Sequence, residues 1–547
     1  MYVFMYVWHT AAYHHLYITP CSLVCMADMR RALITTCLLS TSSRSLSMSP
    51  PPACSPSLAA YEDLTSRLSI PILLQQTSAL LHWDSMVTMP QTDAHHESRG
   101  AQSAALAGIV HEKSTDPAIG TLLDSIDPAT LTEPQQANYR LMKKQFTLTS
   151  KIPQELSERR AKLEADAYVS WTKARASSNF SLFSPTLAKC FTTAVEIAKH
   201  KDPAADPYTT MLDEYEVGMS EGRIFDMFST VRAELVPLIK QVLASPLAPA
   251  TACIAGSFPL PQQKILNDKV TDWCGFKGRQ DVSVHPFTTS FSASDVRITS
   301  RFDSAEFYQG LAGTVHETGH ALYEGALGKE PLAVNAALSM GTHESQSLFW
   351  ERHVGLSSQF WARWGQEART TLGVDASDAD LYGAVNAVKQ SFIRVEADEL
   401  TYPLHVILRT EIERDIVNGK MTVEQLPDVW NRKMKEMLDV DVPDDAKGCL
   451  QDVHWSGLAI GYFPTYLLGA ICAAQLSHYI RLDLDVDSLV KEGDSAPIHA
   501  WLNDKVWRHG SAYESMDALL EAQLGERLNE KYFIEYLKSK YSDLYKL

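Results

Sequence analysis

Two histidines and a glutamate have the spacing that a metal site on one helix requires. The segment from His316 to His320 reads His-Glu-Thr-Gly-His, an HExxH motif. Residues four apart in a helix lie on one face, so both imidazoles can bind one cation from the same side. Glu317 is turned by about 100° from His316, so it can act on a water molecule as general base without binding the metal. The spacing therefore predicts a metallopeptidase centre with His316 and His320 as ligands.

The third ligand must come from another element. A catalytic zinc ion usually has three protein ligands and one open position. Further along the chain, residues 341–345 (Gly-Thr-His-Glu-Ser) begin a second predicted helix, where His343 and Glu344 are the two candidates. We expect one divalent ion per chain, zinc or alternatively cobalt, because two histidines and a carboxylate accept several metals.

The elements around the motif are predicted from local signals. Residues 303–306 (Asp-Ser-Ala-Glu) resemble a capping box that opens the metal helix, and Gly325, Gly328 and Pro331 indicate its end. Just before it, residues 282–302 alternate apolar and β-branched side chains around a Ser-Ala-Ser-Asp turn, which predicts a hairpin. A small sheet is therefore expected beside the metal helix.

Composition limits the classes of protein. The chain has 547 residues, 45% hydrophobic and 21% charged, with a net charge of −17. A core of this size needs no metal to hold it together, so a metal site is expected to be catalytic. No basic stripe is present, which argues against a nucleic-acid partner. The nine cysteines form no CxxC pair, as is typical of reduced thiols in an intracellular protein.

Helical periodicity dominates from residue 57 onward. Residues 129–200 and 510–547 show apolar residues three and four apart. The apolar segment 457–474 contains Pro464 and two tyrosines, so we interpret it as a buried segment and not as a membrane span. These patterns predict one nearly all-helical catalytic domain over 57–547.

Residues 1–56 differ from the rest and are predicted to be an N-terminal extension. From Met29 the chain carries arginines and many serines, with no acidic residue before Glu62. This composition is typical of a mitochondrial or plastid transit peptide. A disordered tail on a cytoplasmic protein is the alternative, and Met26 or Met29 are alternative starts.

Six motifs in a fixed order resemble the carboxypeptidase Taq family of metallocarboxypeptidases, over about residues 59–547. They are HPF at 285–287, DVRIT at 295–299, HETGHALYE from 316, HESQS from 343, IRVEADELTYPLH at 393–405, and GCLQDVHW at 448–455, which continues into GYFPTY at 461–466. Two departures occur. The loop at 326–335 is shorter than in the family pattern. After HESQS this chain continues Leu-Phe-Trp-Glu, where that pattern has an arginine and an asparagine nearby.

The resemblance implies a fold, an activity and a third ligand. It favours Glu344 over His343. The implied fold is mainly helical and two-lobed with a deep central groove, similar to angiotensin-converting enzyme and neurolysin. Family members are commonly homodimers and remove C-terminal residues from peptides with broad specificity, disfavouring proline. A neurolysin-like oligopeptidase or endopeptidase is the alternative function, and a helical binding protein with an inactive site is a more distant one.

The resemblance also suggests substrate-binding residues. His454 and Tyr466 are expected to stabilise the oxyanion opposite the metal helix, while Tyr462 either joins them or packs the core. His285 lies in the first motif and is expected near the substrate. A carboxypeptidase needs a group for the terminal carboxylate, and arginine suits this because its fork binds a carboxylate bidentately. Arg394 and Arg297 are the candidates, with structural ion pairs as the alternative for Arg394 and shaping of the groove wall for Arg297. Arg394 is preferred because it is expected on a long helix.

Overall fold

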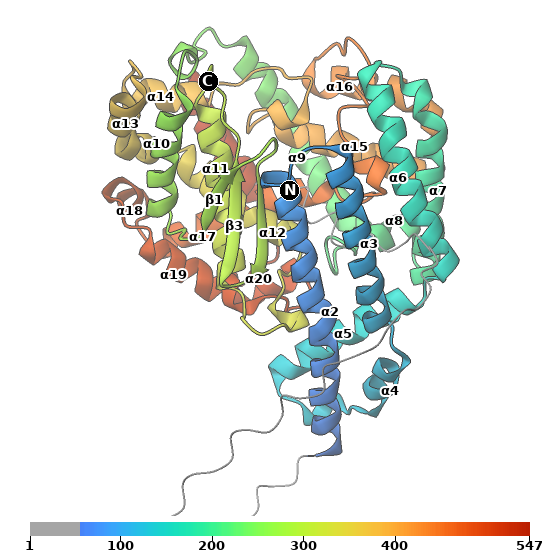
Figure 1. The fold of residues 1–547 in the computed structure, drawn as a ribbon. Helices are drawn as coiled ribbons and strands as arrows, with labels where there is room; N and C mark the ends of the chain where they lie inside the picture. The colour runs from blue at the N-terminus through green and yellow to red at the C-terminus, as the bar shows by residue number, and fades with distance from the viewer. Residues whose placement is uncertain (1–54) are drawn as a thin grey trace, which may run out of the picture.

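The structure, a computed structural model, describes residues 55–547, which are mostly helical with one small sheet (Figure 1). Almost all of the predicted N-terminal extension lies outside these residues. The helices before the sheet are α2 (Pro56–Val87), α3 (Asp93–Ser114), α4 (Pro117–Ser125), α5 (Glu133–Ser150), α6 (Gln154–Ala176), α7 (Ser184–Lys201), α8 (Pro207–Leu212), α9 (Glu221–Ala244) and α10 (Leu260–Trp273). The helical prediction for 129–200 is confirmed by α5, α6 and α7.

The helices after the sheet surround the metal motif and complete the core. They are α11 (Tyr308–Ala326), α12 (Met340–Leu348), α13 (Ser358–Leu372), α14 (Asp378–Val385), α15 (Tyr402–Val417), α16 (Leu426–Leu438), α17 (Pro464–Asp483), α18 (Val486–Glu492), α19 (Ala496–Lys505), α20 (Met516–Leu524) and α21 (Lys531–Tyr545). A π-helix, η5 (Phe349–Gly355), continues directly from α12. Short 3-10 turns include η6 (Arg394–Glu396) and η8 (His454–Gly457).

The sheet has three strands in the order β1-β3-β2. Strands β2 (Phe287–Ser292) and β3 (Asp295–Ser300) are antiparallel, with Phe287 opposite Thr299, which confirms the predicted hairpin. Strand β1 (Arg279–Val282) pairs parallel with β3 and was not predicted. Its four residues, Arg-Gln-Asp-Val, offer no apolar alternation that sequence analysis can detect.

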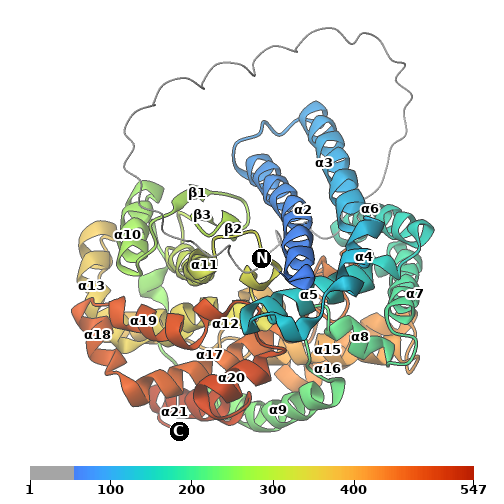
Figure 2. The ribbon, with the colours of Figure 1, turned by 90° about the horizontal axis from the view of Figure 1, so that it is seen from below.

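Helix α11 lies between this sheet and α12, as Figure 2 shows from below. Val296 and Ile298 of β3 pack against Ala321 of α11 in a small apolar cluster. The sheet therefore fixes the rotation of α11 about its axis, which decides where the HExxH side chains point.

The predicted start of the metal helix was wrong by several residues. Asp303 accepts a hydrogen bond from the backbone N–H of Ala305 at 2.8 Å, which forms a local turn. The carboxylate of Glu306 instead accepts from the N–H groups of Tyr308 at 2.6 Å and Gln309 at 2.8 Å. Glu306 thus caps the helix, which begins at Tyr308. The predicted end is confirmed, because α11 stops at Ala326.

The apolar segment 457–474 is buried, as expected. It forms the start of α17, whose first half is enclosed on all sides, and α17 packs closely on α12. Within the described part of the chain, no helix is both long and apolar enough to cross a membrane.

Candidate metal centre

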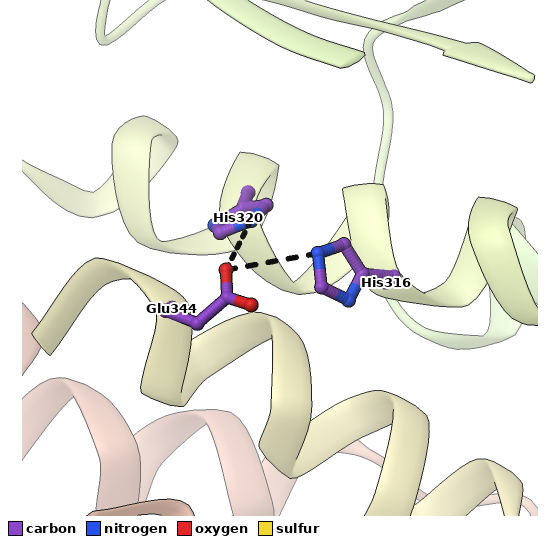
Figure 3. Close-up of side chains that lie close together, drawn as sticks. All are labelled: His316, His320 and Glu344. Carbon is purple, nitrogen blue, oxygen red and sulfur yellow. Dashed lines mark ion pairs between the residues drawn. The ribbon is translucent and has the colours of Figure 1, made fainter. Parts of the chain in front are cut away.

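His316, His320 and Glu344 converge on one point between α11 and α12 (Figure 3). The Glu344 Oε2 atom lies 3.3 Å from His320 Nε2 and 3.8 Å from His316 Nε2. Two ligands bonded at about 2.1 Å to one tetrahedral ion are roughly 3.4 Å apart. The donor set and its spacing therefore fit a divalent ion such as zinc, with only a small adjustment at His316.

Glu351 holds the first histidine in place. Its Oε2 atom lies 2.7 Å from His316 Nδ1, so Nδ1 is engaged and Nε2 faces the metal position. Burial lowers the pKa of His316, but Glu344 and Glu351 outweigh it and raise that pKa to about 9. Sequence analysis named no partner for this histidine. The available signal was the position of Glu351 two helical turns after Glu344, which places both carboxylates on one face.

His343, the rival third ligand, is turned away from the metal position. Its Nε2 atom lies 2.9 Å from Glu324 Oε1. Its ring stacks on that of His320, with centroids 4.4 Å apart and planes inclined by 24°. The geometry therefore favours Glu344 and gives His343 the role of a ring that supports His320.

Two glycines allow the neighbouring helices to approach α12 closely. A Cβ atom on Gly319 of α11 would lie 2.5 Å from the carbonyl oxygen of Gln346. A Cβ atom on Gly469 of α17 would lie 2.8 Å from both Cβ and Cγ of Glu344. The helix that carries Glu344 is thus held between two backbones. At its start, buried Glu216 accepts a hydrogen bond from the Gly341 N–H, and burial raises the pKa of Glu216 to about 8.

Glu317 is buried at the edge of the same pocket and is hydrogen-bonded to the sheet. Thr288 Oγ1, on β2, lies 2.7 Å from Glu317 Oε2 and 2.8 Å from the Glu317 carbonyl oxygen. A hydroxyl has one proton to donate, so it can satisfy one of these oxygens at a time. Nothing in the sequence distinguished Thr288 from the other strand threonines, so this contact was not predicted.

A cavity connects two of the metal ligands, His320 and Glu344, with aromatic residues of the last motif. Its walls are formed by Thr288, Glu317, His320, Met340, His343, Glu344, Tyr462, Thr465 and Tyr466. The hydroxyl of Tyr466 lies 3.2 Å from His454 Nε2. Burial lowers the pKa of His454 to about 3 and raises that of Tyr466 well above its usual value. Both groups are therefore neutral near pH 7, and of the two only Tyr466 is among the residues that line the cavity.

Comparison with known proteins identifies the family of this site. The model of the carboxypeptidase Taq (M32) metallopeptidases matches residues 63–541. The chain belongs to this family. Carboxypeptidase 1 of Bacillus subtilis is 38% identical over 498 residues, which span 89% of this chain and 98% of that protein. Thermostable carboxypeptidase 1 of Thermus thermophilus is 34% identical over 509 residues, covering 89% and 99%.

Solved structures of M32 enzymes have the same fold. Trypanosoma cruzi metallocarboxypeptidase 1 gives a TM-score of 0.84 at 36% identity, covering 88% of this chain and 99% of that one. The M32 carboxypeptidase of Deinococcus radiodurans gives 0.86 at 33%, covering 89% and 100%. The M32 assignment agrees with the order of the motifs and with the donor set at the metal position.

Arg394, the preferred carboxylate ligand of this M32 chain, is on a short turn and not on a long helix. It lies in η6, because α15 begins only at Tyr402. Its guanidinium is 2% exposed, pairs with Asp452 at 2.9 Å and donates to the Tyr402 hydroxyl at 2.9 Å. Asp452 also pairs with Arg409 at 2.6 Å. Arg394 is thus part of a buried ionic cluster behind the pocket.

Arg297 and His285 lie near the sheet, away from the cavity walls. Arg297 pairs with Asp295 at 2.9 Å, and its guanidinium stacks on the Trp83 ring of α2, 4.8 Å from the centroid. It therefore joins α2 to the sheet. His285 is exposed in the connection before β2, and its carbonyl oxygen accepts a hydrogen bond from Ser283. Tyr462 and Tyr466 line the cavity.

Proposed function

We propose that this protein is a metal-dependent carboxypeptidase that hydrolyses the C-terminal peptide bond of peptides with broad specificity, disfavouring proline. The observation that carries the proposal is the convergence of His316, His320 and Glu344 in a chain of the M32 family, with Glu317 on the wall of the adjoining cavity. We propose zinc as the ion, because nitrogen and carboxylate donors at this spacing suit tetrahedral zinc, with cobalt as the substitute.

The metal ion and the protein groups around the cavity have different roles in hydrolysis. The ion would act as a Lewis acid, making water a stronger acid and polarising the scissile carbonyl. Glu317 takes the proton of the attacking water and delivers it to the leaving amine. Thr288 holds the Glu317 carboxylate at Oε2, so one carboxylate oxygen is oriented and the other is available for the proton.

Tyr466 and His454 supply the remaining stabilisation. Tyr466 keeps its proton, since its pKa is raised well above the usual value, and its hydroxyl can donate to the developing oxyanion. Neutral His454, with Nε2 3.2 Å away, can donate its Nε2–H to that hydroxyl, which leaves the tyrosine proton for the oxyanion. Tyr462 stands edge-on to Tyr466, with centroids 5.4 Å apart, and limits its movement.

The terminal carboxylate of the substrate is proposed to bind near Arg394, with Arg297 and His285 further out. The support for Arg394 is its position 4.7 Å from the centroid of the Tyr466 ring. We also propose that residues 57–547 form the catalytic domain, two-lobed around a groove as in angiotensin-converting enzyme and neurolysin, and that the protein is a homodimer. An intracellular location, with a transit signal over residues 29–57, remains a proposal that a reporter fusion tests.

Two peptides test the activity. An N-blocked peptide with a free C-terminus is expected to lose its last residue, whereas the same peptide with a C-terminal amide is expected to remain intact. Activity is expected to disappear with a chelator and to return with zinc or cobalt. Cleavage of the amide at an internal bond, at a rate similar to the free acid, would instead establish the endopeptidase alternative.

A further inference from the structure

Three arginines are buried among the described residues, and one of them has no anionic partner. Arg394 and Arg409 share Asp452. Arg352 is 6% exposed, yet none of its nitrogens lies within 4.0 Å of a carboxylate of the described chain. Its Nε and Nη1 atoms are enclosed and make no hydrogen bond there. Burying a guanidinium without an ion-pair partner lowers the stability of the fold unless an anion binds and neutralises it.

The acidic groups nearest to Arg352 are committed elsewhere. Glu351, the preceding residue, is held by His316 at 2.7 Å. Glu399 pairs with Lys540 at 2.6 Å and accepts from the Tyr536 hydroxyl at 3.0 Å. Glu344 faces the metal position. Each of these three carboxylates therefore has another partner or faces the metal position, and the Nε and Nη1 atoms of Arg352 keep no hydrogen-bond acceptor among the described residues.

Arg352 lies one aromatic ring behind the catalytic cavity. Its guanidinium is 5.1 Å from the centroid of the Tyr402 ring. The Tyr402 ring in turn meets the ring of Tyr466 edge-on, with centroids 6.2 Å apart, and Tyr466 lines the cavity. The attraction to the Tyr402 ring replaces only part of the hydration that the guanidinium loses.

We propose that Arg352 binds a small monovalent anion beside Tyr402. The anion is either the carboxylate of the peptide substrate or a free halide, since both carry a single negative charge and both can accept hydrogen bonds from the unsatisfied Nε and Nη1 groups of Arg352. This inference rests on the proposed carboxypeptidase activity. In the first case Arg352 takes the role proposed above for Arg394 and determines selectivity for a free C-terminus. In the second case a halide positions Tyr402 and, through it, Tyr466.

Arg352→Gln and Arg352→Lys test the proposal, with exposed Arg432→Gln as the matched control for loss of a surface charge. Each protein is first checked for folding and for one bound zinc ion. The thermal midpoint is then measured with sodium chloride against sodium isethionate at constant ionic strength, and KM is measured for a free-acid peptide.

The two sources of the anion give different results. If it is a halide, chloride raises the midpoint and the activity of the wild type and of Arg432→Gln, and Arg352→Gln loses this response. If it is the substrate carboxylate, chloride has no effect on the midpoint, and Arg352→Gln raises KM for the free acid at least tenfold. Arg352→Lys keeps the charge but not the planar guanidinium, so its KM and chloride response are expected to lie between those of the wild type and those of Arg352→Gln.

The proposal is overturned if folded, zinc-loaded Arg352→Gln keeps the wild-type KM and the wild-type chloride response. If Arg352→Gln does not fold, Arg352→Lys decides in its place, because unchanged KM and chloride response in that variant overturn the proposal equally. A wild type that binds zinc but hydrolyses neither peptide refutes the carboxypeptidase activity itself, so the two failures are distinguishable.

Discussion

Adding one methyl group to Gly469 is expected to move Glu344 and weaken metal binding. The Cβ atom of Gly469→Ala would lie 2.8 Å from Glu344 Cβ and Cγ and 3.1 Å from the Gly341 carbonyl oxygen. Carbon atoms in favourable contact are about 3.5–4.0 Å apart, so α12 and α17 must separate by roughly 0.7–1.2 Å. Glu344 Cβ is fixed to the helix backbone and cannot avoid the contact by changing rotamer.

The expected losses of stability and of zinc affinity follow from this displacement. Overpacking a close-packed core costs about 1–3 kcal/mol of stability, and we expect the free energy of unfolding to fall by that amount. Because one ligand moves away from the His316 and His320 pair, zinc affinity is expected to fall by about 10–100-fold, the range seen when groups that orient a ligand are lost.

The assay is a zinc titration against a chromophoric chelator together with denaturant unfolding of the metal-free protein. Gly108→Ala is the matched control, since a Cβ atom on that α3 glycine has nothing within 4 Å. It should leave zinc affinity unchanged and stabilise the protein by about 0.5–1 kcal/mol. If Gly469→Ala binds zinc as tightly as the wild type and unfolds within about 0.5 kcal/mol of it, the packing argument is wrong.

Four further predictions concern the site. Glu317→Gln should keep the metal and lose several orders of magnitude in kcat, and near-normal turnover would exclude Glu317 as the base. Glu344→Ala should lose tightly bound metal, measured by elemental analysis after dialysis, and one retained ion per chain would indicate another third ligand. His316 has a pKa raised from 6.5 to about 9 in the metal-free protein. Below that pH an incoming ion must displace its proton, so metal affinity should rise with pH up to about 9. Calorimetry in two buffers of different ionisation enthalpy should show about one proton released per ion near pH 7. Arg394→Met leaves Asp452 buried with one partner fewer, so it should cost about 3–5 kcal/mol of stability. If it instead raises KM for free-acid peptides at unchanged stability, Arg394 binds the substrate carboxylate.

Local patterns predicted the parts of the site that depend on neighbours in sequence. The four-residue spacing of His316 and His320 fixes their common face whatever surrounds the helix. The hairpin was equally local, because alternation and a turn lie within one segment. Glu351 and Thr288 were missed because their contacts depend on how η5 and β2 are placed against α11, which no local pattern specifies.

The long helix expected around Arg394 shows how a cap can override periodicity. Asp398 Oδ1 accepts from the N–H groups of Leu400 and Thr401 at 2.9 and 3.0 Å. This turn competes with helix formation. Pro403 then lies in the first turn of α15, where its missing N–H costs nothing. The helix therefore starts after the acidic segment, and Arg394 is left on a separate turn.

The confinement of α12 between Gly319 and Gly469 has a consequence for which ions the protein accepts. The helix carrying Glu344 is in contact with a backbone on each side, so the three donor atoms form a triangle of nearly fixed size. Ions with bonds of about 2.0–2.2 Å fit this triangle. Calcium needs six or more oxygen ligands, whereas this triangle offers two nitrogens and one carboxylate, and the packed helices cannot move to bring in further ligands. The protein is thus expected to discriminate against calcium already in the metal-free state, because helix packing, and not the bound ion, sets the positions of the donor atoms.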